Sequence, residues 1–439
     1  MTVARARSIA TVAGLALWLA AWLGRPAGLA GTAWTVLLGV GTILLLAAAA
    51  GSAAAWLYGR LRRFVQVRRY QRDQASTAST GAEPSVSVPA TTRPAATQPA
   101  ESHPTGAGLA TGALIAAGPV GCAAVLVTRE GNGPEEMRAV RSGAGRSGRP
   151  GLAVTGDTRF EIGSLTKVFT GLILAALVVR GETSLDTTLG TVLGLPGQAG
   201  GSITLRDLAT HTSGLPRLMP GARMTARVLT SDPDPYRGIG LAHATSTLQR
   251  HPPAAPGTFR YSNLGYQLLG AALAAATGTS WPNLVRQRVC RPLGLTATGV
   301  GPDAGTARGH DRAGLPVPYW DSTELPAAGG LVSCAADLEA FLRAQLDPGR
   351  TELEEAIRLS RTSHTAGQAV RPAGLGWMLE TTPGGTLAWH NGGTGGFGAF
   401  LAVADGPGRP AGIAVLANSA HTTALDVCAR RALKTLPDG

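Results

Sequence analysis

Two long uncharged and mostly apolar runs stand near the N-terminus, at residues 8–24 and 34–58. A helix that crosses a bilayer needs about 20 apolar residues, so the second run is long enough and the first is at the short limit. We expect two transmembrane helices. The alternatives are a single helix, or a cleaved signal peptide followed by one anchor.

Residues 73–106 have a different composition, which is rich in Ser, Thr, Pro and Ala and almost free of large apolar side chains. Such a segment cannot bury enough apolar surface to offset the entropy that is lost on ordering. We therefore expect a disordered linker. It would separate a membrane region with a basic flank, 1–72, from a globular domain over 107–437.

Short apolar runs predict the elements of the globular domain. The run 164–180 is apolar on every side after its first turn, which is typical of a buried central helix, and Gly181 is its natural stop. Strands are predicted at 120–128, within 131–145, and at 386–390, 398–403 and 412–417, before a closing helix at 421–436. This order indicates an α/β fold in which an antiparallel sheet is flanked by helices and carries an inserted, mostly helical lobe. It would follow the N-terminal transmembrane helices.

Charge limits the classes of partner. Apolar residues make up 44% of the chain and charged residues 15%, so a large core is possible and disorder of the whole chain is excluded. The formal net charge is +12, but residues 1–72 hold nine arginines and no acidic residue, which leaves only +3 for the rest. This distribution favours contact with a lipid bilayer and argues against a nucleic-acid partner. No pattern indicates an oligomeric state.

Candidate chemistry begins in the first turn of the predicted central helix, at Ser164 and Lys167. Residues i and i+3 share one face of a helix, so the hydroxyl and the amine can meet. The chain has 37 arginines and only two lysines, and a buried lysine can lose its proton and act as a base, whereas arginine cannot. We therefore expect Lys167 to activate the Ser164 hydroxyl as a nucleophile. The alternative is a helix cap beside an exposed charge.

A second cluster contains Tyr261 and Asn263. Their side chains project in the same direction from an extended segment, so a phenol and an amide can line one cleft. A nearby cation lowers the pKa of a phenol, so we expect Tyr261 to exchange protons with Lys167. Asn263 is expected to position Lys167 and to bind a substrate carbonyl. The alternative is a turn before a helix, with Asn263 as the cap.

A third cluster, His390, Asn391 and Gly392, stands at the end of a predicted strand, and Gly393 follows it. Glycines let a backbone approach a ligand closely, and an N–H group at such an edge can complete an oxyanion hole. The alternative is a β-hairpin turn, because Asn-Gly is a strong signal for one.

Taken in order, Ser-x-x-Lys, Tyr-Ser-Asn and His-x-Gly resemble the motifs of the serine β-lactamase and penicillin-binding-protein superfamily, in its class C-like branch. The resemblance extends over residues 105–437. This branch includes class C β-lactamases, D-alanyl-D-alanine carboxypeptidases, D-aminopeptidases and related esterases. It implies catalysis through an acyl-serine, without metal or cofactor, on a small-molecule or peptide substrate that has an amide or ester carbonyl.

The resemblance also implies roles for single residues. Ser164 would form the acyl-enzyme, and Lys167 and Tyr261 would exchange protons with it. Tyr261 would also serve the leaving group and the deacylating water. Asn263 would orient the acyl side chain, and the backbone N–H groups of Ser164 and Gly393 would form the oxyanion hole.

His390 stands where many relatives have a lysine, and Asn391 takes the place of their threonine. A mostly neutral histidine offers less charge to a substrate carboxylate. Efficient turnover of β-lactams is therefore less expected than serine acyl transfer as such. His211, outside the three clusters, is expected to brace a loop.

We therefore predict a membrane-tethered serine hydrolase that is D-Ala carboxypeptidase-like, D-aminopeptidase-like or esterase-like. The alternatives are a β-lactamase and, from another class, a non-catalytic membrane-bound sensor that uses the pocket only to bind a ligand. The expected location is the cell membrane. Arginines on both flanks of the apolar runs place the domain in the cytoplasm by the positive-inside rule, whereas the resemblance implies the outside.

Overall fold

The computed structural model describes residues 121–434, apart from 130–136, 196–199, 222–223, 226, 228–231, 233, 251–252, 255, 322–323, 366–370 and 407–409. The predicted membrane helices at 8–24 and 34–58 and the linker at 73–106 lie outside these residues. None of the helices in the described part of the chain is both long and apolar enough to span a membrane.

The chain divides into two compact units. One comprises Met1–Ala75 and Pro220–Pro235, and the other comprises Ser76–Met219 and Tyr236–Gly439. Every helix, strand and site residue described below belongs to the second unit.

A six-stranded sheet forms the frame of this unit, in the order β2-β1-β9-β8-β7-β6, and all neighbouring strands are antiparallel. Its strands are β1 (Cys122–Arg129), β2 (Met137–Ala144), β6 (Met378–Thr382), β7 (Gly385–Gly393), β8 (Gly398–Asp405) and β9 (Ala411–Ala417). The interior strands β1 and β9 are buried along nearly their whole length, which explains their unbroken apolar sequences. The predicted antiparallel sheet, built from strands near both ends of the domain, is therefore confirmed.

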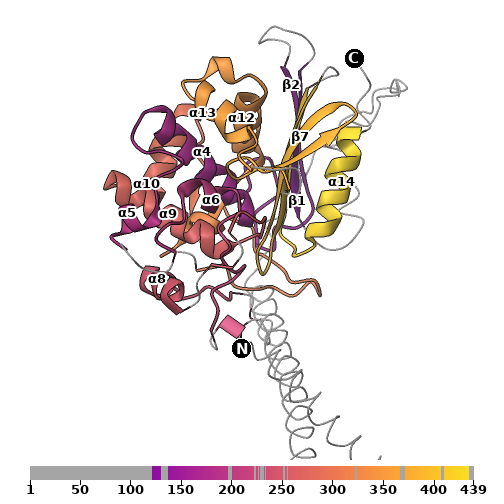
Figure 1. The fold of residues 1–439 in the computed structure, drawn as a ribbon. Coiled ribbons are helices and arrows are strands. Elements are labelled where there is room, and N and C mark those ends of the chain that lie inside the picture. The colour runs from indigo at the N-terminus through magenta and orange to yellow at the C-terminus, as the bar shows by residue number, and fades with distance from the viewer. Residues whose placement is uncertain are drawn as a thin grey trace, which may run out of the picture. The chain divides into compact units, whose positions relative to one another are not determined.

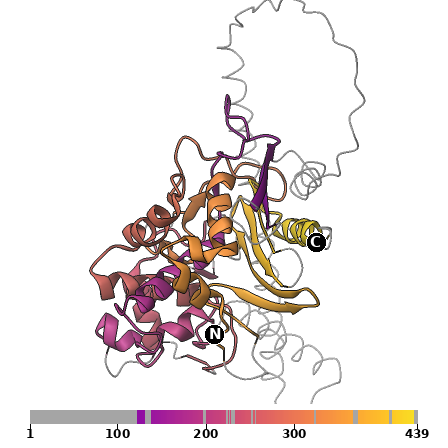
Figure 2. The same cartoon turned by 90° about the horizontal axis from the view of Figure 1, so that it is seen from above.

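Helices pack against both faces of this sheet (Figures 1 and 2). On one face, α14 (Thr422–Lys434) contributes Leu425 to a core cluster that also contains Phe400 of β8. On the other face lies α12 (Ala335–Leu346). Gly412 in β9 allows α12 to come close, because a Cβ at this position would lie only 2.8 Å from a methyl carbon of Leu342.

The helix α4 (Thr166–Val179) is central and is buried as far as Leu177, as its apolar sequence predicts. It ends at Val179, two residues before Gly181, whose φ of +70° is in the left-handed region. The Gly181 N–H donates to the carbonyl of Val178 at 3.0 Å, and the Glu182 N–H donates to the carbonyl of Leu177 at 2.9 Å. The predicted stop signal is therefore confirmed.

Most of the remaining helices pack around α4 and α9. They are α5 (Leu189–Leu193), α6 (Leu205–Ala209), α8 (Leu241–Arg250), α9 (Asn263–Thr277), α10 (Trp281–Val285), α11 (Arg291–Leu293) and α13 (Glu354–Arg361), with a π-helical turn at Arg286–Cys290. Short 3₁₀ turns occur at Gly163–Leu165, Pro326–Ala328 and Pro348–Arg350.

A second, three-stranded sheet has the order β3-β5-β4. Its strands are β3 (Phe160–Glu161), β4 (Gly299–Val300) and β5 (Leu331–Ser333). No apolar periodicity predicts strands of two or three residues. The sheet joins the chain before Ser164 to the chain after Ala328, because the Ile162 N–H donates to the carbonyl of Leu331 at 3.0 Å. It thereby positions two walls of the site described next.

Candidate active site

Ser164 and Lys167 meet at the N-terminal end of α4. Ser164 lies in the 3₁₀ turn Gly163–Leu165, and Lys167 lies in the first turn of α4. Lys167 Nζ is 3.0 Å from Ser164 Oγ and donates a hydrogen bond of 2.5 Å to the carbonyl oxygen of Ala328. The spacing of three residues thus brings the hydroxyl and the amine within hydrogen-bonding distance.

A charged ammonium group would be costly at this position. Lys167 has 0% exposed surface, and no carboxylate in the described part of the chain pairs with it. Burial lowers the pKa of Lys167 well below its ordinary value, and the charge of Arg217 lowers it further. A neutral amine in contact with Ser164 Oγ can accept the hydroxyl proton.

Tyr261 completes this group of side chains. Its ring centroid lies 5.0 Å from Lys167 Nζ, and its phenol lies close enough to Ser164 for the hydroxyl to influence its pKa. Burial raises the pKa of Tyr261 above its ordinary range, and the Ser164 hydroxyl and the charge of Arg217 oppose this rise only in part. A nearby cation does lower this pKa, but the expected net lowering is wrong, because the loss of hydration outweighs the neighbouring charge. Tyr261 is therefore a protonated phenol at neutral pH.

His211 holds the segment that carries Tyr261. Its backbone carbonyl accepts a hydrogen bond from the Arg260 N–H at 2.7 Å, and its Nδ1 accepts one from the Ser262 N–H at 3.1 Å. Its ring centroid lies 4.4 Å from that of Tyr261. With a φ of +63°, it is the only non-glycine residue in the described part of the chain with a positive φ. The loop that His211 braces is therefore the one that presents Tyr261.

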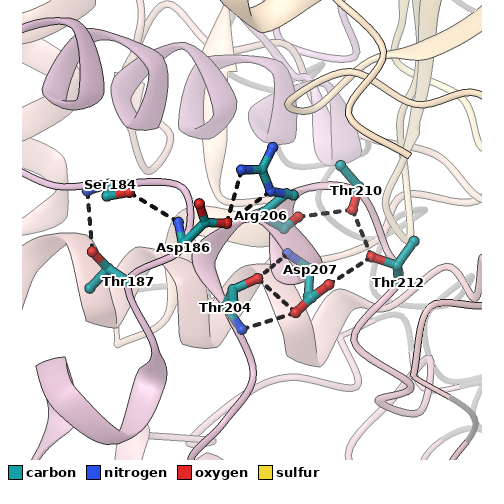
Figure 3. A network of polar contacts seen from close by, with 8 residues as sticks. All are labelled: Ser184, Asp186, Thr187, Thr204, Arg206, Asp207, Thr210 and Thr212. Atoms are coloured by element: carbon teal, nitrogen blue, oxygen red, sulfur yellow. Dashed lines mark hydrogen bonds and ion pairs between the residues drawn. The ribbon is translucent and has the colours of Figure 1, made fainter. Parts of the chain in front are cut away.

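A network of polar side chains connects the start of α6 with Thr210 and Thr212, the residues on either side of His211 in the sequence (Figure 3). Thr204 and Asp207 form a capping box at the start of α6, in which the N–H of each residue donates to the side chain of the other at 3.0 Å. Thr212 Oγ1 donates to Asp207 Oδ1 at 3.2 Å and lies 2.9 Å from Thr210 Oγ1. The two neighbours of His211 in the sequence are therefore tied together and to α6.

Asn263 is the first residue of α9, and the cap of this helix is Ser262, whose Oγ accepts a hydrogen bond from the Gly265 N–H at 2.8 Å. Asn263 Nδ2 donates to Tyr236 Oη at 2.6 Å, and Asn263 Oδ1 is buried without a partner in the described part of the chain. The amine of Lys167 bonds to other residues, so the expected contact between Asn263 and Lys167 is not seen. Asn263 instead lines the same pocket as Ser164.

The end of β7 passes very close to the turn that carries Ser164. A Cβ at Gly392 would lie 2.0 Å from the carbonyl oxygen of Ile162, and a Cβ at Gly163 would lie 2.6 Å from the amide nitrogen of Gly393. Glycine is needed at both contacts because any side chain would collide with the opposite backbone. The amide of Gly393 therefore lies next to the residue that precedes Ser164.

His390 and Asn391 point to opposite faces of β7, because side chains alternate along a strand. The ring centroid of His390 lies 6.0 Å from that of Tyr261, and burial, with the nearby Lys167, lowers the pKa of His390 to about 3. This ring is therefore neutral at physiological pH. Asn391 Nδ2 donates to Asp426 Oδ2 of α14 at 2.8 Å, so its side chain lies away from Ser164.

A pocket with about 520 Å³ of space, open to solvent, adjoins Ser164. Asn263 lines it together with four residues that no sequence motif indicates: Tyr236, Gln267, Trp320 and Glu324. They come from three segments of the chain: the one before α8, the helix α9, and the stretch that carries both Trp320 and Glu324. Only the fold brings them together, which is why the sequence pattern does not predict them.

The chain is similar in sequence to known proteins. A beta-lactamase of Pseudomonas fluorescens is 28% identical over 325 residues, which cover 65% of this chain and 86% of that protein. The D-alanyl-D-alanine-carboxypeptidase/endopeptidase AmpH of Escherichia coli K12 is 30% identical over 306 residues, which cover 63% of this chain and 75% of that protein.

A solved structure shows the same fold. The D-alanine carboxypeptidase AmpC of Burkholderia cenocepacia is 26% identical and superposes with a TM-score of 0.61, and the match covers 75% of this chain and 98% of that one. The model of the Beta-lactamase family matches residues 111–436. The chain therefore belongs to the β-lactamase family, within the superfamily of serine β-lactamases and penicillin-binding proteins.

Proposed function

We propose that the chain is a serine hydrolase that cleaves an amide or ester bond through an acyl-enzyme on Ser164. The observation that carries this proposal is the 3.0 Å distance between Ser164 Oγ and the amine of Lys167, which has 0% exposed surface. The names of its relatives, which include a D-alanyl-D-alanine carboxypeptidase, support the reaction class. We favour a D-Ala carboxypeptidase, a D-aminopeptidase or an esterase.

Acylation begins when the Ser164 hydroxyl gives its proton to the neutral amine of Lys167. Oγ bonds to the carbonyl carbon of the substrate, and the π electron pair of the carbonyl moves to its oxygen. The N–H groups of Ser164 and Gly393 stabilise this oxyanion. The carbonyl of Ala328, 2.5 Å from Nζ, orients the amine and stabilises the ammonium that it becomes.

Tyr261 then relays the proton to the leaving group. Its phenol donates to the departing nitrogen or oxygen and regains a proton from the Lys167 ammonium, while the C–N or C–O bond breaks and acyl-Ser164 remains. In deacylation, water attacks the acyl carbon and its proton passes to Lys167 through Tyr261. The bond to Ser164 Oγ breaks, Oγ recovers a proton, and the carboxylic acid leaves.

A β-lactamase is the second candidate, and the names of several relatives favour it. The carboxylate of a β-lactam would meet the neutral ring of His390 on β7, where burial lowers the pKa to about 3. The side chain at this position therefore offers the bound carboxylate no positive charge. We expect β-lactams to acylate Ser164 more slowly than simple esters do.

We also propose that residues 1–72 hold one or two membrane helices, at 8–24 and 34–58, that 73–106 form a tether, and that 107–437 form the hydrolase domain. A cysteine added after Gly439 tests the side of the membrane. Labelling of intact cells by an impermeant maleimide indicates the outside, and labelling only after lysis indicates the cytoplasm. Extraction of the chain by carbonate, without detergent, would contradict membrane insertion.

Labelling of the full chain in detergent tests the proposed reaction. A fluorophosphonate and a penicillin are each added, and the modified peptide is identified by mass spectrometry. We expect the adduct on Ser164, its loss in Ser164→Ala, and its retention in the control Ser246→Ala on α8. Hydrolysis of p-nitrophenyl esters should continue over many turnovers.

Two results would overturn this proposal. Labelling at another residue, or none in folded protein, contradicts the role of Ser164. Release of at most one equivalent of p-nitrophenol per chain indicates the alternative of a membrane-bound sensor that is acylated once and does not turn over.

A further inference from the structure

The pocket beside Ser164 is acidic. The carboxylates of Asp321 and Glu324 line it, and none of its lining residues in the described part of the chain is a lysine or an arginine. Arg217, whose Cζ lies 4.9 Å from the Tyr261 ring centroid, is not part of the lining. A group that enters this pocket therefore lies near two carboxyl side chains.

We propose that this pocket takes an ammonium group of the substrate, so that the preferred substrates are amides or esters that carry a free amino group. The inference rests on the proposed function for the reaction at Ser164 and adds the class of substrate. It is carried by three features of the lining: a carboxylate without a cation, two orphaned amide oxygens, and a pair of aromatic rings.

Glu324 is the carboxylate without a cation. No hydrogen bond or ion pair joins it to any residue that the structure describes. Many other carboxylates of this arginine-rich chain do pair with arginine, among them Glu182, Asp186, Glu339, Glu354 and Glu380. A Cβ built on Gly240 would lie only 1.8 Å from Glu324 Oε2. The carboxylate therefore lies against the backbone just before α8. No residue in the described part of the chain therefore neutralises Glu324, and a ligand can supply the opposite charge.

Two amide oxygens in the same pocket also lack a donor. Gln267 has 4% exposed surface, and its Oε1 is buried without a partner in the described part of the chain. Asn263 Oδ1 is in the same condition, and its Nδ2 donates to Tyr236 Oη. A buried acceptor without a donor is unfavourable. An ammonium group supplies three donors and no acceptor, so it matches these oxygens.

Two aromatic rings complete the lining. The ring centroids of Tyr236 and Trp320 are 5.1 Å apart, and their planes are inclined by 58°. Trp320 is fixed in place, because its backbone N–H donates to Glu161 Oε1 at 2.7 Å. The faces of such rings attract cations. Rings and carboxylate together resemble the usual composition of sites for organic ammonium ions.

Other substrate groups fit less well. A carboxylate would be repelled by Glu324, and an alkyl chain would leave the oxygens of Gln267 and Asn263 without donors. The matching class is therefore an aminoacyl or aminoalkyl compound whose ammonium group lies within reach of the carbonyl at Ser164.

Calorimetry with the full chain tests this inference without turnover, with benzylammonium chloride as the probe and benzyl alcohol as its neutral counterpart. We expect benzylammonium to bind roughly fivefold more tightly than benzyl alcohol, as for a partly solvated ion pair. Glu324→Gln should remove most of this preference, and Gln267→Leu should reduce it. Glu355→Gln, which removes an exposed carboxylate of α13 outside the pocket, should leave it unchanged.

Equal binding of the two probes, or a preference for benzylammonium that survives in Glu324→Gln, would overturn the inference. Added salt should weaken the binding of benzylammonium and not that of benzyl alcohol. Failure of the proposed function gives a separate result: the fluorophosphonate would not label Ser164, whichever probe binds more tightly in calorimetry.

Discussion

Nδ1 of His211 accepts a hydrogen bond of 3.1 Å from the backbone N–H of Ser262. Burial lowers the pKa of His211 well below its ordinary value, and the nearby Lys167 lowers it further, so the ring is neutral and carries its proton on Nε2. A protonated ring would have a hydrogen on Nδ1 and would lose this bond. The position of Tyr261, which precedes Ser262, therefore depends on a neutral His211.

Replacement of His211 by alanine should weaken both the fold and the reaction. The buried N–H of Ser262 would lose its acceptor, which costs about 1–3 kcal/mol of unfolding free energy. A displaced Tyr261 should lower kcat by on the order of 100-fold. His211→Asn should lose less stability because asparagine tolerates the positive φ. Urea unfolding and ester kinetics measure both effects, and an alanine variant with unchanged kcat would contradict the positioning role.

Replacement of Lys167 by methionine should abolish hydrolysis and stabilise the fold. Because burial lowers the pKa of Lys167, the unfolded chain binds the extra proton between that lowered pKa and the ordinary value of about 10.4. Stability of the natural chain therefore rises with pH through this window, and the buried amine is most unfavourable below it. Methionine has no proton to bind and suits an apolar site.

Urea unfolding at pH 7 and at pH 10 measures how the stability of the two proteins depends on pH. The methionine variant should be the more stable protein at pH 7, and the difference should shrink at pH 10. Lower stability of the variant at pH 7 would mean that Lys167 is held by stabilising interactions that the structure does not contain.

Replacement of Tyr261 by phenylalanine should slow deacylation. The ring would remain against Lys167 while the phenolic proton relay is lost, and general acid–base catalysis of this kind contributes about 10²–10⁴-fold. Mass spectrometry of the enzyme during ester turnover should then find acyl-Ser164 accumulated. Tyr319→Phe is the matched control, because Tyr319 stacks on Phe397 and does not line the pocket. Normal turnover by Tyr261→Phe would exclude the relay.

His390 should make the fold sensitive to acid. Burial, with the nearby Lys167, lowers the pKa of His390 in the folded chain to about 3, whereas a histidine in an unfolded chain titrates near its ordinary value of about 6.5. Its contribution to stability is therefore present above pH 6.5 and is lost as the pH falls toward 3, by up to about 1.4 kcal/mol per pH unit. His390→Gln should flatten this part of the curve of unfolding free energy against pH. The exposed His243→Gln should not, and an unchanged slope in His390→Gln would contradict burial of the ring.

The elements that the sequence predicts well are those with long apolar runs. The helix α4 and the strands β1, β8 and β9 are buried on several sides. Almost all of their residues are therefore apolar, and the sequence pattern reveals them. The second sheet gives no such signal, because β3 is two residues long and β5 is three. Its pairing depends on contacts between segments that are far apart in the chain.

Some features of the site also follow from local sequence spacing, and others depend on contacts between distant segments. The contact between Ser164 and Lys167 follows from helical spacing, and the opposite directions of His390 and Asn391 follow from strand alternation. The pKa of Tyr261 and the pocket residues Trp320 and Glu324 depend on what other segments bury or bring near. These properties are set by tertiary packing, which a pattern along one chain does not contain.

The scarcity of lysine allows a direct measurement of the protonation state of Lys167. The chain has only Lys167 and Lys434, so a Lys434→Arg variant grown on [ε-¹³C]lysine gives a single resonance. We predict that this resonance titrates well below the ordinary lysine value of about 10.4, and that ester hydrolysis declines over the same range as the amine gains its proton. A resonance that stays in its charged position up to the ordinary lysine range would contradict the neutral base on which the proposed reaction depends.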